Sequence, residues 1–153
     1  MQEVSVKIKK TTDDPEFIYP SYAHDGDSGM DVYSLEDISL PMGSTYLFKL
    51  GFEVEIPYGY ELQVRSKSGL TLKEGLIVLN SPGTIDSTYR GECGVILHNE
   101  MKKAYDGNGS KLITKGQKIA QIVLCPVIKC KWEKVDSLED SNRGDGGYGS
   151  TGV

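Results

Sequence analysis

The chain has 153 residues, a usual length for one compact domain with a sizeable buried core. It carries 17 Lys and Arg against 22 Asp and Glu, so its net charge of -5 excludes a global basic field that would gather nucleic acid or an anionic membrane. Eighteen Gly and six Pro interrupt the chain so often that the longest stretch without either runs from Val127 to Arg143, which excludes a helical bundle.

The N-terminus and the cysteines bear on the compartment of the protein. No segment approaches the roughly 20 apolar residues of a membrane span, and MQEVSVKIKK lacks the apolar core of a signal peptide. Cys93, Cys125 and Cys130 are odd in number and not paired in spacing, which favours reduced thiols over a disulfide framework. We therefore expect a cytoplasmic protein that binds neither membranes nor nucleic acids directly.

Alternation of apolar and polar residues dominates the chain and predicts half-buried β-strands. In chain order, strands are expected at Val4 to Ile8, Asp31 to Tyr33, Thr45 to Lys49, Phe52 to Ile56, Tyr60 to Arg65, Glu92 to Asn99, Lys118 to Leu124 and Ile128 to Lys134. Clusters of turn residues separate these short runs. The expected fold class is therefore all-β, a sandwich or barrel in one domain.

One helix, one loop and one tail depart from the strand pattern. Ser68 is placed to cap a helix over Ser68 to Lys73 before Gly75 ends it, and Met101 to Ser110 is expected to be an exposed loop. The tail ends in RGDGGYGSTGV, where five glycines in eleven residues leave nothing to offset the entropy of ordering. We expect a β domain over residues 1–136 and a flexible Gly-rich C-terminal arm over residues 137–153.

Acidic segments offer candidate functional residues. Asp25 to Glu36 places acids at positions 1, 3 and 12 of a calcium-binding loop, but Met30 stands where that loop needs Gly, which argues against an EF-hand. Asp31, at the start of its strand, can instead hold a hydrated metal ion. Asp86, in the turn-rich segment from Ser81 to Gly91, can either deprotonate a water or simply cap a turn.

Five short segments follow one another in a characteristic order and spacing. They are Ala23 to Ser34 (AHDGDSGMDVYS), Lys67 to Lys73 (KSGLTLK), Gly83 to Gly91 (GTIDSTYRG), Gly116 to Gln121 (GQKIAQ) and Arg143 to Gly152 (RGDGGYGSTG). Together they resemble the motifs of the trimeric deoxyuridine triphosphate nucleotidohydrolases, the dUTPases. The resemblance implies a jelly-roll-like β-barrel or sandwich, a homotrimer, and three active sites at subunit interfaces, each closed by a C-terminal arm.

The resemblance also implies a reaction, in which water attacks the α-phosphorus of dUTP to give dUMP and pyrophosphate, keeping uracil out of DNA and supplying dUMP for thymidylate synthesis. Asp86 would be the general base, and Asp31 would hold Mg2+ through coordinated water. The phosphate chain would contact Lys67, Ser68, Gly69, Gln121, Arg143, Ser150 and Thr151. The uracil and the deoxyribose would contact Asn80, Gly83, Thr84, Ile85, Tyr89, Gly94 and Tyr148.

Two residues depart from the family pattern. Lys67 replaces the usual Arg, so a forked phosphate contact becomes a point charge that Arg65 is placed to supplement. Tyr148 replaces the usual Phe and still offers a ring that can stack on uracil.

Two other functions remain open at this point. A dCTP deaminase resembles the same fold family, but it needs a Glu-based proton relay where this chain has Ile85, Asp86 and Tyr89. A regulatory dUTPase homologue would use its arm, or the loop from Met101 to Ser110, to bind a protein partner.

Overall fold

The computed structural model describes residues 3–101 and 109–147, which form eleven strands and one helix. The strands are β1 (Lys7–Lys10), β2 (Met30–Tyr33), β3 (Ile38–Pro41), β4 (Thr45–Lys49), β5 (Phe52–Glu55), β6 (Tyr60–Arg65), β7 (Leu76–Val78), β8 (Gly83–Asp86), β9 (Gly94–Asn99), β10 (Ser110–Ile113) and β11 (Lys118–Pro126). The helix, α1, spans Ser68–Glu74.

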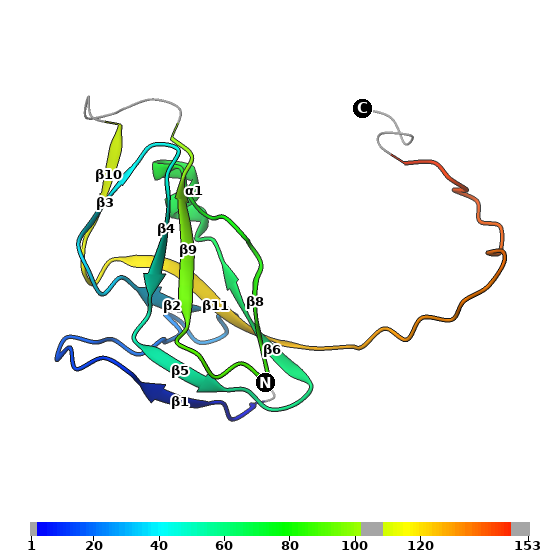
Figure 1. Cartoon of the computed structure of the whole chain (residues 1–153), viewed down its shortest axis with the longest axis horizontal. Coiled ribbons are helices and arrows are strands. Elements are labelled where there is room, and N and C mark those ends of the chain that lie inside the picture. The colour runs from blue at the N-terminus through cyan, green and yellow to red at the C-terminus, as the bar shows by residue number, and fades with distance from the viewer. Residues whose placement is uncertain (1–2, 102–108, 148–153) are drawn as a thin grey trace.

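Two sheets make up most of the molecule. One has the strand order β2-β11-β6-β8 and the other the order β4-β9-β7, while β1 pairs with β5 and β10 with β3. All of these pairs are antiparallel. Figure 1 shows β1 and β5 at one end of the molecule and β3 with β10 at the other. The result is a jelly-roll-like sandwich that is not closed into a barrel, and it confirms the predicted all-β class with one short helix.

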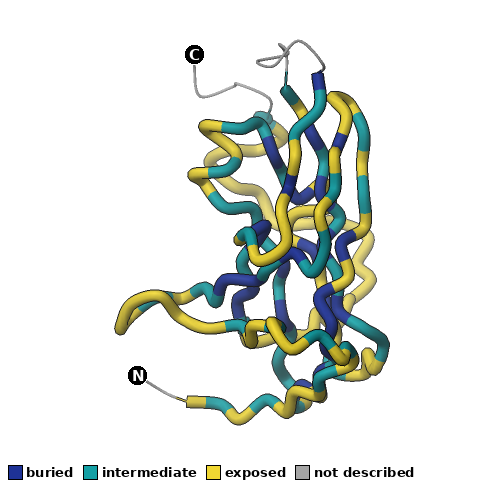
Figure 2. Tube along the Cα trace, turned by 90° about the vertical axis from the view of Figure 1, so that its left-hand side faces the viewer, coloured by how far each residue is buried: buried dark blue, intermediate teal, exposed yellow. Residues whose placement is uncertain are grey.

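The core lies where the alternation predicts it. On β6, Leu62 and Val64 are buried while their neighbours are half exposed, and on β9 the same holds for Val95 and Leu97. Phe48 of β4 is fully buried. Figure 2 shows these buried stretches in dark blue along the inside of the sandwich. Burying one such side chain contributes about 1.5–3 kcal/mol, so this interior fixes how the strands that carry the site are held.

Most predicted strands are present, with small shifts at their ends. β4 and β6 have the predicted bounds, whereas β1 starts three residues later than expected, at Lys7. β3, β7, β8 and β10 were not predicted, because strands of three or four residues contain too few positions to show alternation. β10 begins at Ser110, the last residue of the expected loop; residues 102–108 of that loop lie outside the described residues.

Helix α1 follows the prediction except at its start. Lys67, not Ser68, occupies the N-cap position, with an extended backbone and no capping hydrogen bond from its side chain. The Lys67 ammonium instead pairs with Asp31, so the cap residue is turned toward a carboxylate outside the helix. Gly75 ends the helix with a φ of 63° and donates its N–H to the Thr71 carbonyl at 3.1 Å. Among the described residues, no helix is long and apolar enough to cross a membrane.

The strand expected at Ile128 to Lys134 is wrong. β11 ends at Pro126, and residues 127–145 are all exposed, with Ile128 at 95% and Trp132 at 87% exposure. Figure 1 shows this segment leaving the sandwich in a wide arc. Its alternating pattern suits a strand, but a strand needs a neighbour for its main-chain hydrogen bonds, and within the described part of this single chain it has none.

A matched pair of substitutions tests the location of the core. Leu97→Ala, at 1% exposure, is expected to lower the free energy of unfolding by about 2–5 kcal/mol because it removes buried methyl groups and leaves a cavity. Leu72→Ala, at 86% exposure on α1, should change it by less than about 0.5 kcal/mol. Both are measured by denaturant unfolding at one protomer concentration. Equal losses in the two variants would contradict this description of the core.

Candidate active site

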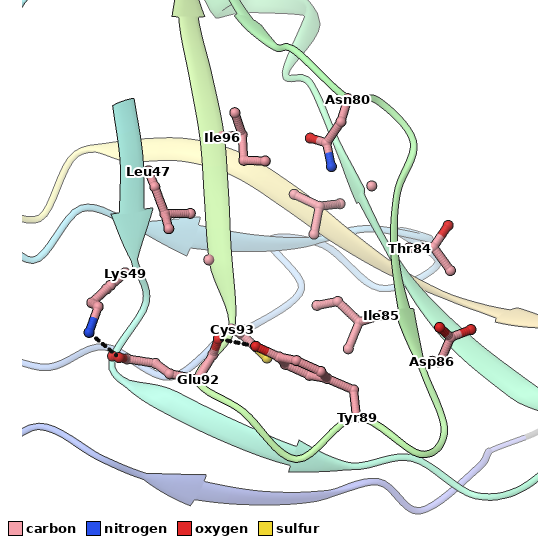
Figure 3. Close-up of a pocket in the computed structure, with 13 residues that line it drawn as sticks. Leu47, Lys49, Asn80, Thr84, Ile85, Asp86, Tyr89, Glu92, Cys93 and Ile96 are labelled. Carbon is pink, nitrogen blue, oxygen red and sulfur yellow. Dashed lines mark hydrogen bonds and ion pairs between the residues drawn. The ribbon is translucent and has the colours of Figure 1, made fainter. Parts of the chain in front are cut away.

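A cavity of about 530 Å3 lies between β8 and the outer face of the β4-β9 pair, and we call it the hairpin cavity (Figure 3). Its lining comprises Leu47, Lys49, Val64, Asn80, Gly83, Thr84, Ile85, Asp86, Tyr89, Glu92, Cys93, Gly94 and Ile96. Every described residue that the resemblance assigned to uracil and deoxyribose belongs to this lining. The structure therefore brings together residues that lie up to fourteen positions apart, from Asn80 to Gly94.

The pairing of β6 with β8 decides which side chains of β8 face the cavity. Leu62 lies opposite Ile85 and Glu61 opposite Asp86. Because side chains alternate along a strand, Ile85 turns toward the interior, while Thr84 and Asp86 point to the other side of β8 (Figure 3). Asp86 is exposed to solvent at the rim of the cavity, where a carboxylate can reach a water molecule.

Two glycines allow close packing at the wall of the cavity. A Cβ added at Gly83 would lie 2.9 Å from Asn80 Nδ2, and one added at Gly94 would lie 2.9 Å from Leu47 Cδ1. Both distances are shorter than real side chains allow. Glycine at these two positions therefore lets the side chains of Asn80 and Leu47 lie directly against the main chain of the wall.

Cys93 forms part of the cavity wall and is only 1% exposed. Burial raises the pKa of its thiol to about 12, and the nearby Glu92 and Glu53 add to the effect. The thiol is therefore neutral at physiological pH and contributes an apolar surface. It is not placed to act as a nucleophile.

A second cavity, of about 380 Å3, lies at the other edge of the four-stranded sheet, and we call it the edge cavity. It gathers Asp31, Lys67 and Gln121, which the resemblance assigned to metal and phosphates from three different segments. Arg65, the residue expected to supplement Lys67, also lines it. Arg65 and Lys67 bring two positive side chains to a lining that also holds Asp27 and Asp31, so this cavity gathers cationic and anionic groups.

The Asp31 carboxylate is buried and pairs with two lysines. Lys67 contacts one of its oxygens, and Lys118 Nζ lies 2.7 Å from the other. Burial alone would raise the pKa of Asp31, but the hydrogen bonds and charges of Lys118 and Lys67 outweigh it and hold that pKa below its usual value. The same bond raises the pKa of Lys118. Asp31 is therefore a fixed negative charge at neutral pH.

Gln121 and the start of α1 complete the edge of this cavity. Gln121 Nε2 donates to the Ser66 carbonyl at 3.1 Å, and a Cβ at Gly29 would overlap the Gln121 amide, so a glycine is needed there. Ser68 and Gly69 are exposed at the first turn of α1 but do not line the edge cavity. A Cβ at Gly69 would meet no atom within 4 Å, so the space above it is open.

The register of the sheet separates the two cavities. Asp31 lies opposite Gln121, which lies opposite Arg65, whereas Asp86 lies opposite Glu61, four residues further along β6. Across the strands, Asp31 and Asp86 are three strand spacings apart, which is about 14 Å. Along the strands they are four residues apart, which is about 13 Å. These two perpendicular distances combine to about 20 Å between the two residues of one chain. One chain does not bring these two carboxylates together.

The described part of the arm contacts itself. Arg143 Nε donates to the Gly146 carbonyl at 2.7 Å, and the Gly144 N–H donates to Ser141 Oγ at 3.1 Å. Arg143 therefore lies away from both cavities in the single chain. Tyr148, Ser150 and Thr151, the other residues predicted in the arm, lie outside the described residues.

Sequence analysis missed several residues of both cavities. Leu47, Lys49 and Ile96 line the hairpin cavity from strands whose pairing was not predicted. Glu92, next to the Gly83 to Gly91 segment, was assigned only to a strand. Lys118 lines neither cavity but pairs with Asp31, and it could have been found because it stands at the Arg position of the family pattern in GQKIAQ, as Lys67 does in its own segment.

Comparisons with known proteins identify the family of this chain. A family model described as dUTPase matches residues 15–152. The deoxyuridine 5'-triphosphate nucleotidohydrolase of Crocosphaera subtropica is 46% identical over 153 residues, and the match covers 100% of both chains. The structure of a mutant dUTPase of Staphylococcus bacteriophage 80alpha with dUpNHpp has a TM-score of 0.85 at 27% identity, covering 97% of this chain and 99% of that one.

A second solved structure shares the fold at lower identity. It is a mutant dUTPase of phage phi11 of S. aureus, described as revealing the coordination of a structural Mg(II) ion, and it has a TM-score of 0.77 at 23% identity. The match covers 90% of this chain and 100% of that one, and at this identity it bears on the fold alone. The family model and the relative that aligns over the full length settle the family. This chain belongs to the dUTPases.

Proposed function

We propose that this dUTPase hydrolyses dUTP to dUMP and pyrophosphate by attack of a water on the α-phosphorus, with Asp86 as the general base. One observation carries the proposal. The hairpin cavity holds all the described residues expected to bind uracil and deoxyribose, with Asp86 exposed at its rim. A carboxylate in that position can orient and deprotonate a water beside the first phosphate of a nucleotide whose base fills the cavity.

The hairpin cavity would select the nucleotide by shape and by hydrogen bonds. Main-chain groups at Gly83 and Gly94, which line the cavity, together with the Asn80 amide, can pair with the uracil edge and mismatch the amino group of cytosine. Ile85 and Cys93 form an apolar wall that leaves little space for the 5-methyl group of thymine. Tyr89 would pack against the deoxyribose and exclude a 2'-hydroxyl, and Tyr148 of the arm would stack on the base.

The edge cavity would hold the phosphate chain. Lys67, Arg65 and Gln121 line one cavity and carry the charge and the hydrogen-bond donors that phosphates need, and the open first turn at Ser68 and Gly69 follows Lys67 directly in the chain. Lys67 has a long flexible stem, so it can exchange its contact with Asp31 for a phosphate oxygen. Arg143, Ser150 and Thr151 would reach the γ-phosphate once the arm closes.

Mg2+ is the cofactor, and the residues of the edge cavity fit it. The described residues contain no group of three or more His, Cys, Asp or Glu side chains that could hold a metal. Mg2+ does not need one, because it keeps several waters and binds through one or two carboxylates and the substrate phosphates. The buried, ionised Asp31 supplies such a carboxylate. When bound, the ion gathers the triphosphate into one geometry and neutralises charge that develops in the transition state.

The separation of Asp31 and Asp86 supports sites shared between subunits, as in the homotrimer that the resemblance to the family implies. Both carboxylates would act on one phosphate chain through single waters, which is impossible for groups about 20 Å apart in one chain. A second copy would supply the missing half. The exposed Ile128 and Trp132 are consistent with this, because large apolar side chains in a segment without a strand partner favour burial against another copy.

The proposed cellular role is to keep uracil out of DNA and to provide dUMP for thymidylate synthesis in the cytoplasm. Neither alternative function is supported by a specific observation. A deaminase would need a glutamate at the base, whereas Glu92, the glutamate in the cavity lining, has its carboxylate bound to Gly51, Thr11 and Lys49. A protein-binding role for the 101–110 loop concerns mainly residues that the structure does not describe.

Asp86→Asn tests the proposed function directly. Pyrophosphate release from dUTP should be selective over dCTP, dTTP and UTP, should stop with a chelator, and should fall by at least about 100-fold in Asp86→Asn, because the amide cannot accept a proton. The matched control is Asp13→Asn, an exposed carboxylate remote from both cavities, which should keep full turnover. Full turnover in Asp86→Asn would exclude it as the base, and ammonia release from dCTP would establish the deaminase instead.

Deletion of residues 143–153 tests the arm. Turnover of dUTP should fall at least about 100-fold, since the truncated enzyme loses charge neutralisation at the γ-phosphate and the exclusion of water. The thermal unfolding curve should be unchanged, because the contacts of Arg143 and Gly144 stay within the arm. A truncated enzyme with the wild-type rate would refute the role of the arm.

A further inference from the structure

Glu92 is the best-anchored residue of the loop that joins β8 to β9. Its Oε1 accepts hydrogen bonds from the Gly51 N–H at 3.2 Å and from the Thr11 hydroxyl at 3.5 Å. Its Oε2 pairs with Lys49 Nζ at 3.2 Å. These partners come from the segment after β1, the end of β4 and the turn before β5, so one carboxylate ties the loop to three parts of the sandwich.

The main chain of Glu92 holds the ring of Tyr89. The Tyr89 hydroxyl donates to the Glu92 carbonyl at 3.0 Å (Figure 3). The ring lies close over the backbone of Gly91, where an added Cβ would be 2.7 Å from Tyr89 Cζ. Because Tyr89 is 45% exposed, the core does not hold its ring, and the orientation of the ring depends on this hydroxyl and on the position of the carbonyl that accepts it.

The remaining bonds of the loop are internal. The Tyr89 N–H donates to the Asp86 carbonyl, and Arg90 Nη1 donates to the carbonyls of Ser87 and Tyr89 at 2.8 and 2.7 Å. At Cys93 the main chain is hydrogen-bonded to the region where β4 leads into β5, since the Leu50 N–H donates to the Cys93 carbonyl and the Cys93 N–H donates to the Phe52 carbonyl at 2.9 Å. The carboxylate of Glu92 and the main chain of Cys93 thus together attach the self-contained turn to the sandwich.

We propose that Glu92 is a positioning residue, which fixes the Tyr89 ring at the wall of the hairpin cavity and thereby sets the discrimination between deoxyribose and ribose nucleotides. The inference rests on the proposed role of Tyr89 against the sugar. An apolar wall rejects an added hydroxyl by steric exclusion, and it does so only if it cannot move aside. The network from Gly51 and Lys49 through Glu92 to Tyr89 provides that rigidity.

The test compares kcat/KM for dUTP with kcat/KM for UTP in the full-length enzyme with Mg2+. Glu92→Ala should lower the ratio of the two about three- to tenfold, mainly by raising kcat/KM for UTP, because the ring is freed. Glu92→Gln keeps an oxygen that can accept the Gly51 N–H and should restore most of the ratio. A merely structural role would lower both values together and leave the ratio unchanged.

Two tyrosine variants make the test independent of folding effects in Glu92→Ala. Tyr89→Phe keeps the ring but removes its hydroxyl, so it should show the same fall in the ratio, and Glu92→Ala added to it should cause no further fall. Tyr89→Ala removes the wall and should abolish most of the discrimination.

The outcomes separate the inference from the function on which it rests. An unchanged dUTP-to-UTP ratio in both Glu92→Ala and Tyr89→Phe, with loss of discrimination in Tyr89→Ala, would overturn the role of Glu92 alone. An unchanged ratio in Tyr89→Ala would overturn the proposed role of Tyr89 and the inference together.

Discussion

Main-chain hydrogen bonds hold β2, β11, β6 and β8 in one antiparallel register, and the rest of the site depends on it. A slip of one residue would turn Leu62, Val64 and Ile122 from the core to solvent, so the register is strongly fixed. The same register places Asp31 at one edge of the sheet and Asp86 at the other. A stable fold thus separates two groups that the proposed mechanism needs together, and assembly of several copies is the simplest way to bring them together.

Charge in this protein is organised locally. The net charge of -5 opposes an anionic substrate, yet Lys67 and Lys118 both pair with Asp31, and Arg65 lines the same edge cavity as Asp31 and Lys67. Because the two lysines hold the pKa of Asp31 low, the carboxylate is ionised and ready for a cation at neutral pH. Both lysines stand where the family pattern has arginine, and a flexible point charge can change partners more easily than a fork that binds a carboxylate through two bonds.

The sequence predicted the parts of the fold that rest on local patterns. Alternation of apolar and polar residues predicted β4 and β6, and the glycine at position 75 predicted the end of α1. Strands as short as β7 carry no such pattern. The segment from Ile128 to Lys134 shows the opposite failure, since it has the pattern of a strand but no partner in the described part of the single chain, and pairing is a property of tertiary or quaternary structure.

The sequence motifs predicted the residues of the candidate site that lie within the motifs, but not the residues that face them. Residues 83–91 lie within one motif and were found, but the walls that face them come from β4 and β9, which become neighbours only through folding. Glu92 illustrates the limit, because its partners Thr11, Lys49 and Gly51 lie more than forty positions away in the sequence. No spacing rule connects them.

Complementation between two inactive variants tests the shared site most directly. Asp86→Asn and Asp31→Asn are unfolded together, refolded as an equal mixture and assayed for dUTP hydrolysis, with each variant refolded alone as the control. If one chain supplies Asp86 and another supplies Asp31, about a quarter of the sites in random trimers combine two intact carboxylates, and the mixture regains about a quarter of the wild-type rate. A mixture that stays as inactive as the separate variants, although mixed trimers are shown to form, would contradict the account.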